Sequence, residues 1–538
     1  MTDTPQSSLR KGRLGVIGVV FFVVAASAPL VGITGAVPVA MLVGNGAGTP
    51  GAYLVVGLTL LLFSVGYAAM SQRVTNSGAF FAYVGKGLGV NAGVASAFVS
   101  ILTYVTIQLA IYGFFGGLVE GTMAERGVSL PWYIWAFIAW ALVTGLSLLS
   151  VDIGAKVLGV LLVLEIVSLL VAAVAMLANG GPEGWNFAAS FSPENIFAGG
   201  FAGGAGIALA FALASFIGFE ATAIYGEESK DPKRTVPLAT YIAISTISIL
   251  FAIVSFAMVT GMGASGIIDE VVNRSMDADG NVLANPAGVL FSLTEQYVGP
   301  WLVTIMTILV ITSLFAGLLA FQNASARYFF ALGRGGVFPA RAAVTNKAGA
   351  PVGGVVITSA LAALVMIIFA VAGLDPIGNL FFWMSSITAI SVVIVEIMVS
   401  IAVIAYFRRE GGGNLWKTVI APAVSIVLLA IGLYLVMSRF NLLAGTVPDG
   451  VDPTLPESAW LLNPLGWFLV LLPFVFLAIG YVAALINKKE NEQLVKDLAS
   501  LSTSSFGAVA VPAAPNAAPQ HSHCRNGDPC VTTTSISM

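Results

Sequence analysis

Three carboxylic acids fall in the middle of long apolar segments: Glu165, Glu220 and Glu396. A carboxylate at the centre of a membrane helix costs about 2.5–3.5 kcal/mol on insertion scales, so each of them needs a reason. Burial favours the protonated form of such a group, which makes it a candidate proton carrier. We predict that Glu220 carries an exchangeable proton, with Glu165 as the second candidate. A neutral glutamic acid that is hydrogen-bonded between two helices is the alternative.

Helix-breaking residues surround one of these acids and also occur near the N-terminus. The first apolar segment reads VVAASAPLVGITGAVP and contains Pro29 and Gly32, and the segment around Glu220 reads FALASFIGFEATAIYGEE and contains Gly218. Proline removes a backbone hydrogen bond, and glycine favours non-helical backbone. One interruption alone is compatible with a plain kink. Interruptions at corresponding places in the first and sixth segments predict an inverted repeat with a ligand site at the two breaks.

Unwound backbone inside a membrane must find partners, because hydrocarbon offers none. A zwitterion supplies a carboxylate for free N–H groups at a half-helix N-terminus and an ammonium group for free carbonyls. Since Pro29 has no N–H, we predict that the following amides and a nearby hydroxyl hold the carboxylate, and that carbonyls of the second break hold the ammonium group. The predicted binding residues are Ser27, Ala28, Leu30, Val31 and Gly32 at the first break, and Phe216, Ile217, Gly218 and Phe219 at the second.

Aromatic residues near the predicted breaks are candidates for gates over the site. We select Tyr104, Phe219 and Trp383, with Phe219 first because it follows Gly218. Most aromatic residues of membrane proteins pack between helices or lie at the interface, which is the alternative for each of them.

The sequence offers little for enzymatic, metal or nucleic-acid chemistry. Its only two cysteines and two histidines lie in the polar segment HSHCRNGDPC near the C-terminus, whose spacing fits no standard zinc site. No HExxH or GxSxG motif is present, and a net charge of −3 without a basic stripe does not suit nucleic acid. We therefore predict no catalytic residue, no metal site, no cofactor and no nucleic-acid partner.

The elements that position these residues are predicted to be membrane helices. With 58% hydrophobic and 9% charged residues, the chain is too apolar for a water-soluble domain. Apolar runs of this length must be helices, because barrel strands would alternate over about 10 residues. The twelve predicted segments are 14–43, 51–70, 91–119, 131–149, 153–178, 201–226, 237–262, 299–330, 353–373, 377–407, 416–438 and 464–487.

Charge distribution gives these segments an orientation. With both termini in the cytoplasm, all of the 23 lysines and arginines fall inside except Arg126, Arg274 and Arg439. We therefore predict an all-α polytopic protein of the cell membrane with twelve transmembrane helices. Its predicted parts are a cytoplasmic tail (1–13), a transport core of ten helices (14–410), two peripheral helices (411–487) and a disordered cytoplasmic tail (488–538).

Three motifs resemble one transporter superfamily. SFIGFEATAIYGEESKDPKRTVPLA closely resembles the helix 6 and following-loop signature of the amino acid, polyamine and organocation (APC) superfamily. RVTNSGAFFAYVGKGLG and NASARYFFALGRGGVFP resemble the cytoplasmic loops after helices 2 and 8 of the same superfamily. The resemblance covers roughly residues 14–487. Many relatives carry a GSG-like turn in helix 1 where this chain has SAPLVG, and some carry a lysine in helix 5 where this chain has Glu165.

The resemblance implies a leucine-transporter-like fold and secondary transport. Helices 1–5 and 6–10 would form a five-plus-five inverted repeat, broken helices 1 and 6 would hold the amino-acid backbone, and helices 3, 8 and 10 would line the side-chain pocket. The implied function is transport of amino acids by alternating access, proton-coupled or by exchange, with a small molecule, the lipid bilayer and protons as partners. A polyamine or organic-amine permease and a transporter-like nutrient sensor are the alternatives.

Overall fold

The computed structural model describes residues 12–75, 78–149, 151–276 and 287–486, so the predicted terminal tails and their histidines and cysteines fall almost wholly outside it. The long helices are α3 (Thr49–Ser71), α5 (Val90–Ala124), α6 (Trp132–Ser147), α7 (Val151–Asn179), α11 (Pro232–Met262), α14 (Pro300–Arg334), α15 (Val352–Val371), α16 (Phe382–Glu410), α17 (Ala421–Ser438) and α19 (Pro464–Ile486). The shorter helices are α1 (Val16–Ala26), α2 (Pro29–Val39), α4 (Phe80–Leu88), α8 (Phe187–Phe191), α9 (Pro193–Ile196), α10 (Gly204–Ala214), α12 (Ile267–Arg274), α13 (Gly288–Tyr297) and α18 (Phe440–Leu443). The 3₁₀ and π-helical turns are η1 (Ala40–Asn45), η2 (Gly46–Gly48), η3 (Phe219–Ala223), η4 (Gly226–Glu228), η5 (Ala340–Ala343), η6 (Pro376–Phe381), η7 (Trp416–Ile420) and η8 (Pro456–Ser458).

Every predicted apolar segment contains helix, which confirms an all-helical, multi-pass membrane protein. Ten helical stretches of the described chain are long and apolar enough to cross a membrane. The first stretch, Val16–Ser71, includes both the first and the second predicted segments, while α6, in the fourth predicted segment, has only 16 residues. The described residues contain no β-strand; an isolated bridge joins Leu14 and Ser229, and Met276 is a further bridge residue.

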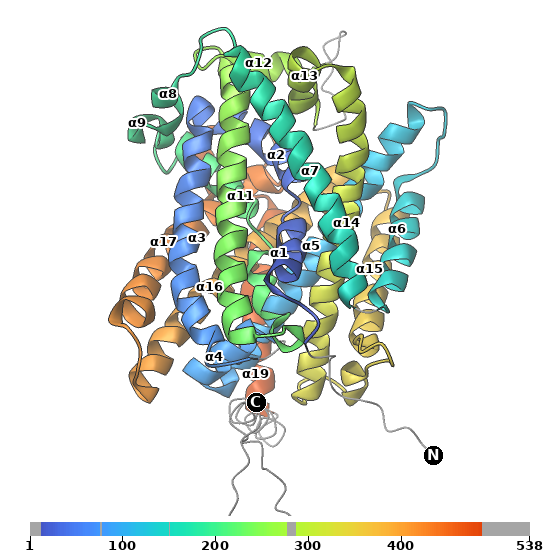
Figure 1. Ribbon diagram of the computed structural model, residues 1–538, viewed down its shortest axis with the longest axis vertical. Coiled ribbons are helices and arrows are strands. Elements are labelled where there is room, and N and C mark those ends of the chain that lie inside the picture. The colour runs from blue at the N-terminus through green and yellow to red at the C-terminus, as the bar shows by residue number, and fades with distance from the viewer. Residues whose placement is uncertain (1–11, 76–77, 150, 277–286, 487–538) are drawn as a thin grey trace, which may run out of the picture.

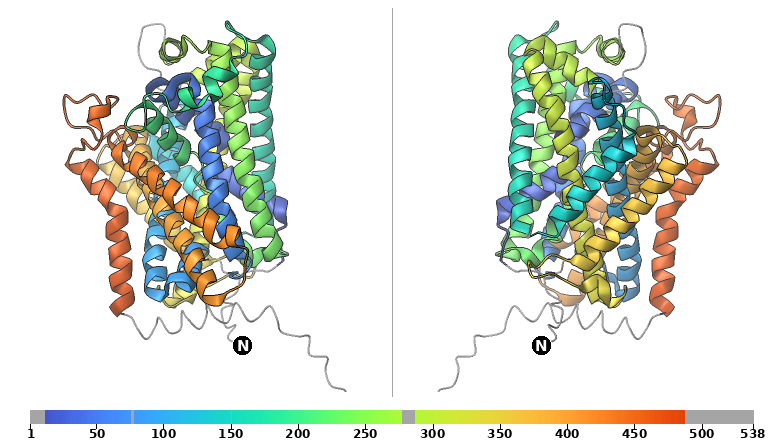
Figure 2. Two further views of the ribbon diagram at one scale, coloured as in Figure 1. Left: turned by 90° about the vertical axis from the view of Figure 1, so that its left-hand side faces the viewer. Right: turned by 90° about the vertical axis from the view of Figure 1, so that its right-hand side faces the viewer.

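The long helices run between two ends of one bundle. In Figure 1, α4 lies at the lower end, whereas α12 and α13 lie at the upper end. The terms lower end and upper end have this meaning in the rest of the text. The short helix α2 continues upward from α1, so the first broken helix runs from the lower toward the upper end (Figure 1). α17 and α19 lie on the outside of the bundle, as the two side views show (Figure 2).

Small residues let the upper halves of the two broken helices approach closely. A Cβ atom added to Gly44 of η1 would lie 3.0 Å from the Cβ atom of Ala208 in α10. Larger side chains at either position would push these backbones apart. Arg439, which is buried beside α18, donates to the carbonyl of Ala202 in the loop before α10 and to the carbonyl of Leu455 (2.8 Å). The loop after α17 is thereby tied to the second broken helix.

Another contact at the upper end joins α11 to the loop after α7. The carboxylate of Glu183 accepts hydrogen bonds from the amides of Ala264 (3.1 Å) and Ser265 (3.1 Å) and from the Ser265 hydroxyl. The Ser265 hydroxyl and amide lower the pKa of Glu183 below its ordinary value, because they bind the charged form.

Candidate functional site

The first broken helix is interrupted at two residues between α1 and α2. Ser27 keeps helical backbone angles, but Ala28 is left-handed (φ 41°, ψ 67°), a conformation that costs an L-residue about 1–2 kcal/mol. Pro29 then begins α2, where a missing N–H does no harm. The interruption lies directly before Pro29, and Gly32 is inside α2.

The second broken helix is interrupted over four residues, 215–218. α10 ends at Ala214, and the chain continues as the 3₁₀ helix η3 from Phe219. Gly218 has a φ of 117°, which L side chains rarely adopt, so the glycine itself permits the turn.

The two breaks contact each other. The Ser27 hydroxyl donates to the Ile217 carbonyl at 3.5 Å, a long hydrogen bond. A Cβ atom added to Gly218 would lie 2.8 Å from the Cβ atom of Ala26, the last residue of α1. Two segments that are about 190 residues apart in the sequence are thus packed backbone against backbone at one place.

A cavity of about 210 Å³ opens at this meeting point. Its walls come from both breaks and from α2, α5, α14, η6 and α16, which include the third, eighth and tenth predicted helices as the resemblance implied. The lining is apolar apart from four serine side chains, and no charged residue of the described chain lines it. Because α2 runs upward from the break, the cavity extends from the breaks toward the upper end (Figure 1).

About half of the predicted binding residues line this cavity. Those that do are Ser27, Ala28, Val31, Gly32 and Ile217, and those that do not are Leu30, Phe216, Gly218 and Phe219. Phe219 packs edge-on against Phe63, with ring centroids 6.0 Å apart, so the first-choice gate residue is a core residue in this conformation. Neither Tyr104 nor Trp383 lines the cavity; their rings pack against Tyr328 (5.4 Å) and Phe369 (5.9 Å).

Most residues of the cavity wall opposite the breaks were not predicted from the sequence. The further lining residues include Ile107, Ile111 and Phe114 of α5, Leu314 of α14, and Phe381, Phe382, Ser385, Ser386 and Ala389 of η6 and α16. Those from α16 recur at intervals of three and four, the spacing of one helix face. That spacing is visible in the sequence, but it does not show whether the face looks into a cavity, a neighbouring helix or lipid.

Backbone groups of the breaks are largely paired. The Leu30 amide donates to the Glu165 carboxylate (2.5 Å), and the Gly32 amide donates to the Ala28 carbonyl (3.0 Å). Of the three predicted donors, only the Val31 amide has no hydrogen-bond partner among the described residues. At the second break, the Phe216 carbonyl accepts from the Phe219 amide (3.4 Å) and the Gly218 carbonyl from the Ala221 amide (3.1 Å).

Glu220 lies beside the second break but does not line the cavity. It is fully buried; its Oε2 accepts from the Gly218 amide at 2.8 Å, and its Oε1 has no hydrogen-bond partner among the described atoms. The Tyr67 hydroxyl of α3 donates to the Glu220 carbonyl (2.5 Å) and accepts from the Ala223 amide (3.3 Å). Tyr67 thereby holds η3 at both of its ends.

Glu165 of α7 acts on the first break from the side away from the cavity. Its carboxylate is buried and accepts the Leu30 amide, one of the free N–H groups at the N-terminus of α2. A carboxylate is a favourable partner there, because the helix dipole is positive at that end. Glu165 therefore caps α2 from another helix.

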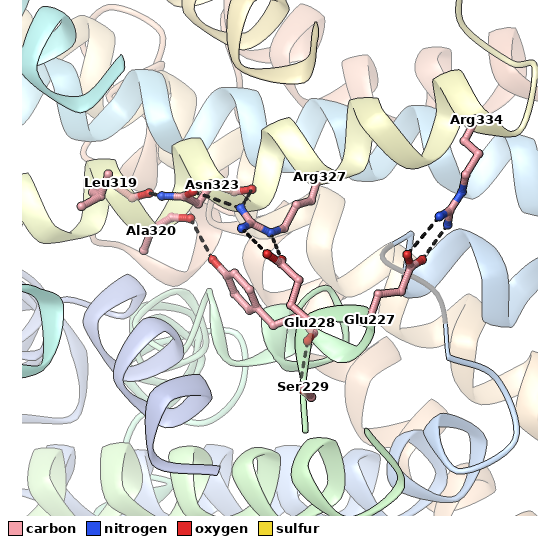
Figure 3. Close-up of polar contacts among 9 residues, drawn as sticks. Glu227, Glu228, Ser229, Leu319, Ala320, Asn323, Arg327 and Arg334 are labelled. Atoms are coloured by element: carbon pink, nitrogen blue, oxygen red, sulfur yellow. Dashed lines mark hydrogen bonds and ion pairs between the residues drawn. The ribbon is translucent and has the colours of Figure 1, made fainter. Parts of the chain in front are cut away.

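Below the second break, two ion pairs connect η4 to α14 (Figure 3). Arg327 makes a bidentate pair with Glu228, and both side chains are only 2% exposed. Arg327 also donates to the carbonyl (2.9 Å) and side-chain oxygen (3.0 Å) of Asn323. Arg334, which lies about two turns further along the same face of α14, pairs with Glu227 (2.6 Å).

The same η4 segment also holds the start of α1. The Leu14 amide donates to the Glu228 carbonyl (3.1 Å), and the Lys230 amide donates to the Leu14 carbonyl (2.8 Å). The ring of Phe22 in α1 stacks on Tyr225 (centroids 4.6 Å apart), which lies under the Arg327 guanidinium (5.1 Å). α1, η4 and α14 are therefore joined to one another below the breaks. The four residues of the two ion pairs were not predicted as site residues. They are Glu227 and Glu228, in the motif at helix 6, and Arg327 and Arg334, in the motif after helix 8.

No group of three or more His, Cys, Asp or Glu side chains within the described ranges could hold a metal ion. The residues at the breaks offer hydrogen-bond donors and acceptors, apolar side chains and the carboxyl groups of Glu165 and Glu220.

Comparisons with known proteins find amino-acid permeases among the relatives of this chain. A family model described as amino acid permease matches residues 16–505. The chain is 24% identical over 480 residues to a probable amino-acid permease of Schizosaccharomyces pombe, meu22, covering 84% of this chain and 78% of that protein. It is 25% identical over 386 residues to the branched-chain amino acid permease BcaP of Lactococcus lactis, covering 68% of this chain and 76% of that protein.

Among solved structures, the fold is similar to that of a mutant manganese transporter of Eremococcus coleocola. The TM-score is 0.54 at 12% sequence identity, over 90% of this chain and 98% of the other. At this identity the likeness concerns the fold alone.

Proposed function

Because this chain belongs to the amino acid permease family of the APC superfamily, we propose that it is a secondary active transporter that moves amino acids with apolar side chains across the cell membrane by alternating access. One observation carries the proposal: two broken helices meet at an apolar cavity that no charged side chain lines. Broken backbone suits the two charges of an amino acid, and apolar walls suit an uncharged side chain. Transport of amino acids as such follows from the family.

A cationic amine fits this cavity less well. A polyamine carries two or more charges and would need acidic partners to offset their desolvation, whereas the four phenylalanines of the lining offer cation–π contact alone. Glu165 and Glu220 are the acids whose carboxylates bind the backbone at the two breaks, and neither lines the cavity. A nutrient sensor with a transporter fold is the remaining alternative, and measurement of flux separates it from a carrier.

In this proposal the carboxylate of the substrate binds the Val31 amide and the Ser27 hydroxyl. Both residues line the cavity, and both belong to the first break. The ammonium group faces the Ile217 carbonyl, which now accepts only the long hydrogen bond from Ser27. The side chain extends between α5 and α16, where Ile111 and Ala389 lie. Glu220 holds the coupling proton, because it binds the break through the Gly218 amide without contacting the substrate.

The proposed architecture places both termini in the cytoplasm and counts twelve transmembrane helices. α1 to α7 and α10 to α16 then contain the two five-helix halves, with α17 and α19 as the peripheral helices. The lower end becomes the cytoplasmic end. The cavity extends toward the upper end and the ion pairs close the lower one, so this conformation faces outward.

Uptake into proteoliposomes tests the function. We expect radiolabelled leucine to accumulate against its gradient when the outside is more acidic, and unlabelled isoleucine, valine or phenylalanine to compete where putrescine and lysine do not. Competition by putrescine alone would support the amine permease. Binding of leucine without flux would support a sensor.

Two glycines, one in the cavity wall and one outside the cavity, provide a matched pair of variants. Gly35 lines the cavity, and a Cβ atom there would meet nothing within 4 Å, so Gly35→Leu fills the cavity without a clash at its Cβ. We expect it to lower leucine uptake at least about tenfold, since a leucine occupies much of the available volume. Gly145 of α6 is equally free of neighbours but outside the cavity, so Gly145→Leu should transport normally. Equal activity of both variants would place the substrate elsewhere.

A further inference from the structure

One residue of the cavity wall comes from a segment that follows the ten-helix core. Leu443, in the short helix α18, lines the cavity, whereas every other lining residue lies between Ala26 and Ala389. α18 follows α17, one of the two helices on the outside of the bundle (Figure 2). The substrate position given under the proposed function uses only residues of the core, so this segment has no part in it.

Leu443 reaches the cavity from the upper end. The chain between α17 and α19, residues 439–463, lies toward that end, and we call it the upper loop (Figure 2). The cavity extends in the same direction, because it is lined from Ala28 at the first break to Val39, about 16 Å further along α2. Leu443 therefore belongs to the part of the wall that lies away from the groups proposed to receive the two charges of the substrate.

The position of α18 is fixed by a buried arginine. Arg439 is 1% exposed, and its guanidinium donates to the Ala202 carbonyl before α10 and, within the upper loop, to the Leu455 carbonyl (2.8 Å) and the Ser458 hydroxyl (3.3 Å). The Leu443 amide in turn donates to the Arg439 carbonyl (3.0 Å). A planar guanidinium can bind several acceptors in fixed directions, which a lysine ammonium cannot reproduce. Arg439 thus connects Leu443 to the second broken helix.

The wall above the breaks is apolar on several sides. Val39 of α2, Phe211 of α10 and Phe381 of η6 line the cavity together with Leu443. Such a wall accepts an apolar side chain, and its dimensions decide which one. A leucine needed for packing alone would be enclosed by other side chains, whereas Leu443 borders open volume. Since it comes from a loop, a change in its size alters the cavity without altering a core helix.

We propose that Leu443 is a specificity-determining residue that limits the size of the substrate side chain at the upper end of the cavity, and that Arg439 is the positioning residue that holds it there. The proposal rests on the proposed function, because it requires the amino acid to occupy this cavity. It extends substrate selection to a loop beyond the ten-helix core.

Substitutions at Leu443 test the size limit through the ratio of kcat/KM values for two substrates in proteoliposomes. Leu443→Ala should raise the ratio of tryptophan to leucine at least about tenfold, because one methylene group in an apolar pocket changes selectivity by about tenfold or more. Leu443→Phe should raise the ratio of valine to leucine. Leu442→Ala is the control, since Leu442 is the preceding residue of α18 and does not line the cavity, and both ratios should match the wild type.

Arg439→Lys tests the positioning role. It should move the ratio of tryptophan to leucine in the same direction as Leu443→Ala. Combined with Leu443→Ala it should add little, because both changes act through one side chain. Equal losses of uptake for all substrates, without a change in their ratio, would mean that Arg439 only stabilises the upper loop.

A thiol probe tests the location of Leu443 in intact cells. The only two cysteines of the chain, Cys524 and Cys530, are first replaced by serine. In this background a membrane-impermeant thiol reagent, added outside, should stop leucine uptake by Leu443→Cys, and excess leucine should slow the reaction. Leu442→Cys should keep its uptake.

Two results would overturn the size limit while wild-type uptake is normal. One is unchanged substrate ratios in both Leu443→Ala and Leu443→Phe, and the other is a reaction of Leu443→Cys that leucine does not slow. Absence of amino-acid uptake by the wild type would instead overturn the proposed function, and the selecting role of Leu443 with it.

Discussion

The two breaks meet at one cavity, but they are stabilised in opposite ways. At the first break, the Leu30 amide is bound by Glu165, which comes from α7, 135 residues away. At the second, the Gly218 amide is bound by Glu220, two residues further along the same chain. The first break therefore depends on a tertiary contact, whereas the second is closed by its own sequence.

The residue with a positive φ at each break shows the same difference: at the second break its residue type permits the conformation, and at the first break it does not. Gly218 adopts its φ of 117° without steric cost and leaves room for Ala26, so both its conformation and its size are required. Ala28 has a φ of 41° although its Cβ atom opposes it. Strain at Ala28 persists because Pro29 and the packing around it determine the path of the chain. The comparison teaches that one break is encoded locally and the other is imposed by its surroundings.

The largest loss of stability is expected from a substitution below the second break, where ion pairs join η4 to α14. Arg327→Ala leaves Glu228 buried without a counter-charge and should lower the free energy of unfolding by about 3–5 kcal/mol. Arg334→Ala is the comparison, because its pair with Glu227 is less buried, with side chains 21% and 9% exposed, so we expect a smaller loss than for Arg327→Ala. Denaturant unfolding in detergent measures both. Equal losses in the two variants would show that burial of the Arg327 pair has no special weight.

The next effect concerns Gly218 itself. Gly218→Ala introduces strain at a positive φ and places a Cβ atom 2.8 Å from that of Ala26, so we expect a loss of about 2–4 kcal/mol and little remaining uptake. The melting temperature and leucine uptake in proteoliposomes test this expectation. An alanine variant with wild-type values in both would mean that the second break is not locally encoded.

This difference also explains which part of the site could be predicted. The second break was predicted at Gly218, where α10 has ended, because its glycine and its acid stand two residues apart in the motif SFIGFEATAIYGEE. The first break was expected from Pro29 and Gly32, but the strained residue is Ala28, whose type gives no sign of it. The helical, multi-pass architecture followed from hydropathy alone, because hydrocarbon leaves the backbone little choice.

Contacts between distant segments were not predictable from one sequence. Glu227 and Glu228 stand in one motif and Arg327 and Arg334 in another, about 100 residues later. Their pairing appears only when η4 and α14 are side by side (Figure 3). The same holds for Glu165, which was predicted as a proton carrier and lies at the N-terminus of α2 as a cap.

Removing that cap tests the tertiary dependence of the first break. Glu165→Leu leaves the Leu30 amide buried without its acceptor and should cost about 1–3 kcal/mol. Glu165→Gln keeps an oxygen in place and should cost less than about 1 kcal/mol, because only the charge is lost. Thermal unfolding distinguishes the two. A loss in Glu165→Gln as large as that in Glu165→Leu would assign the stabilisation to the charge rather than to the hydrogen bond.

The smallest effect should have the opposite sign. Ala28→Gly relieves about 1–2 kcal/mol of left-handed strain, and the greater freedom of glycine in the unfolded chain opposes this by about 0.5–1 kcal/mol. We therefore expect unchanged or slightly higher stability, by up to about 1.5 kcal/mol, with uptake preserved. Gly218→Ala and Ala28→Gly are reverse exchanges at the two breaks, so the pair forms its own control. A marked loss of stability in Ala28→Gly would show that the Cβ atom of Ala28 contributes packing that outweighs its strain, and the contrast between an imposed and an encoded break would then disappear.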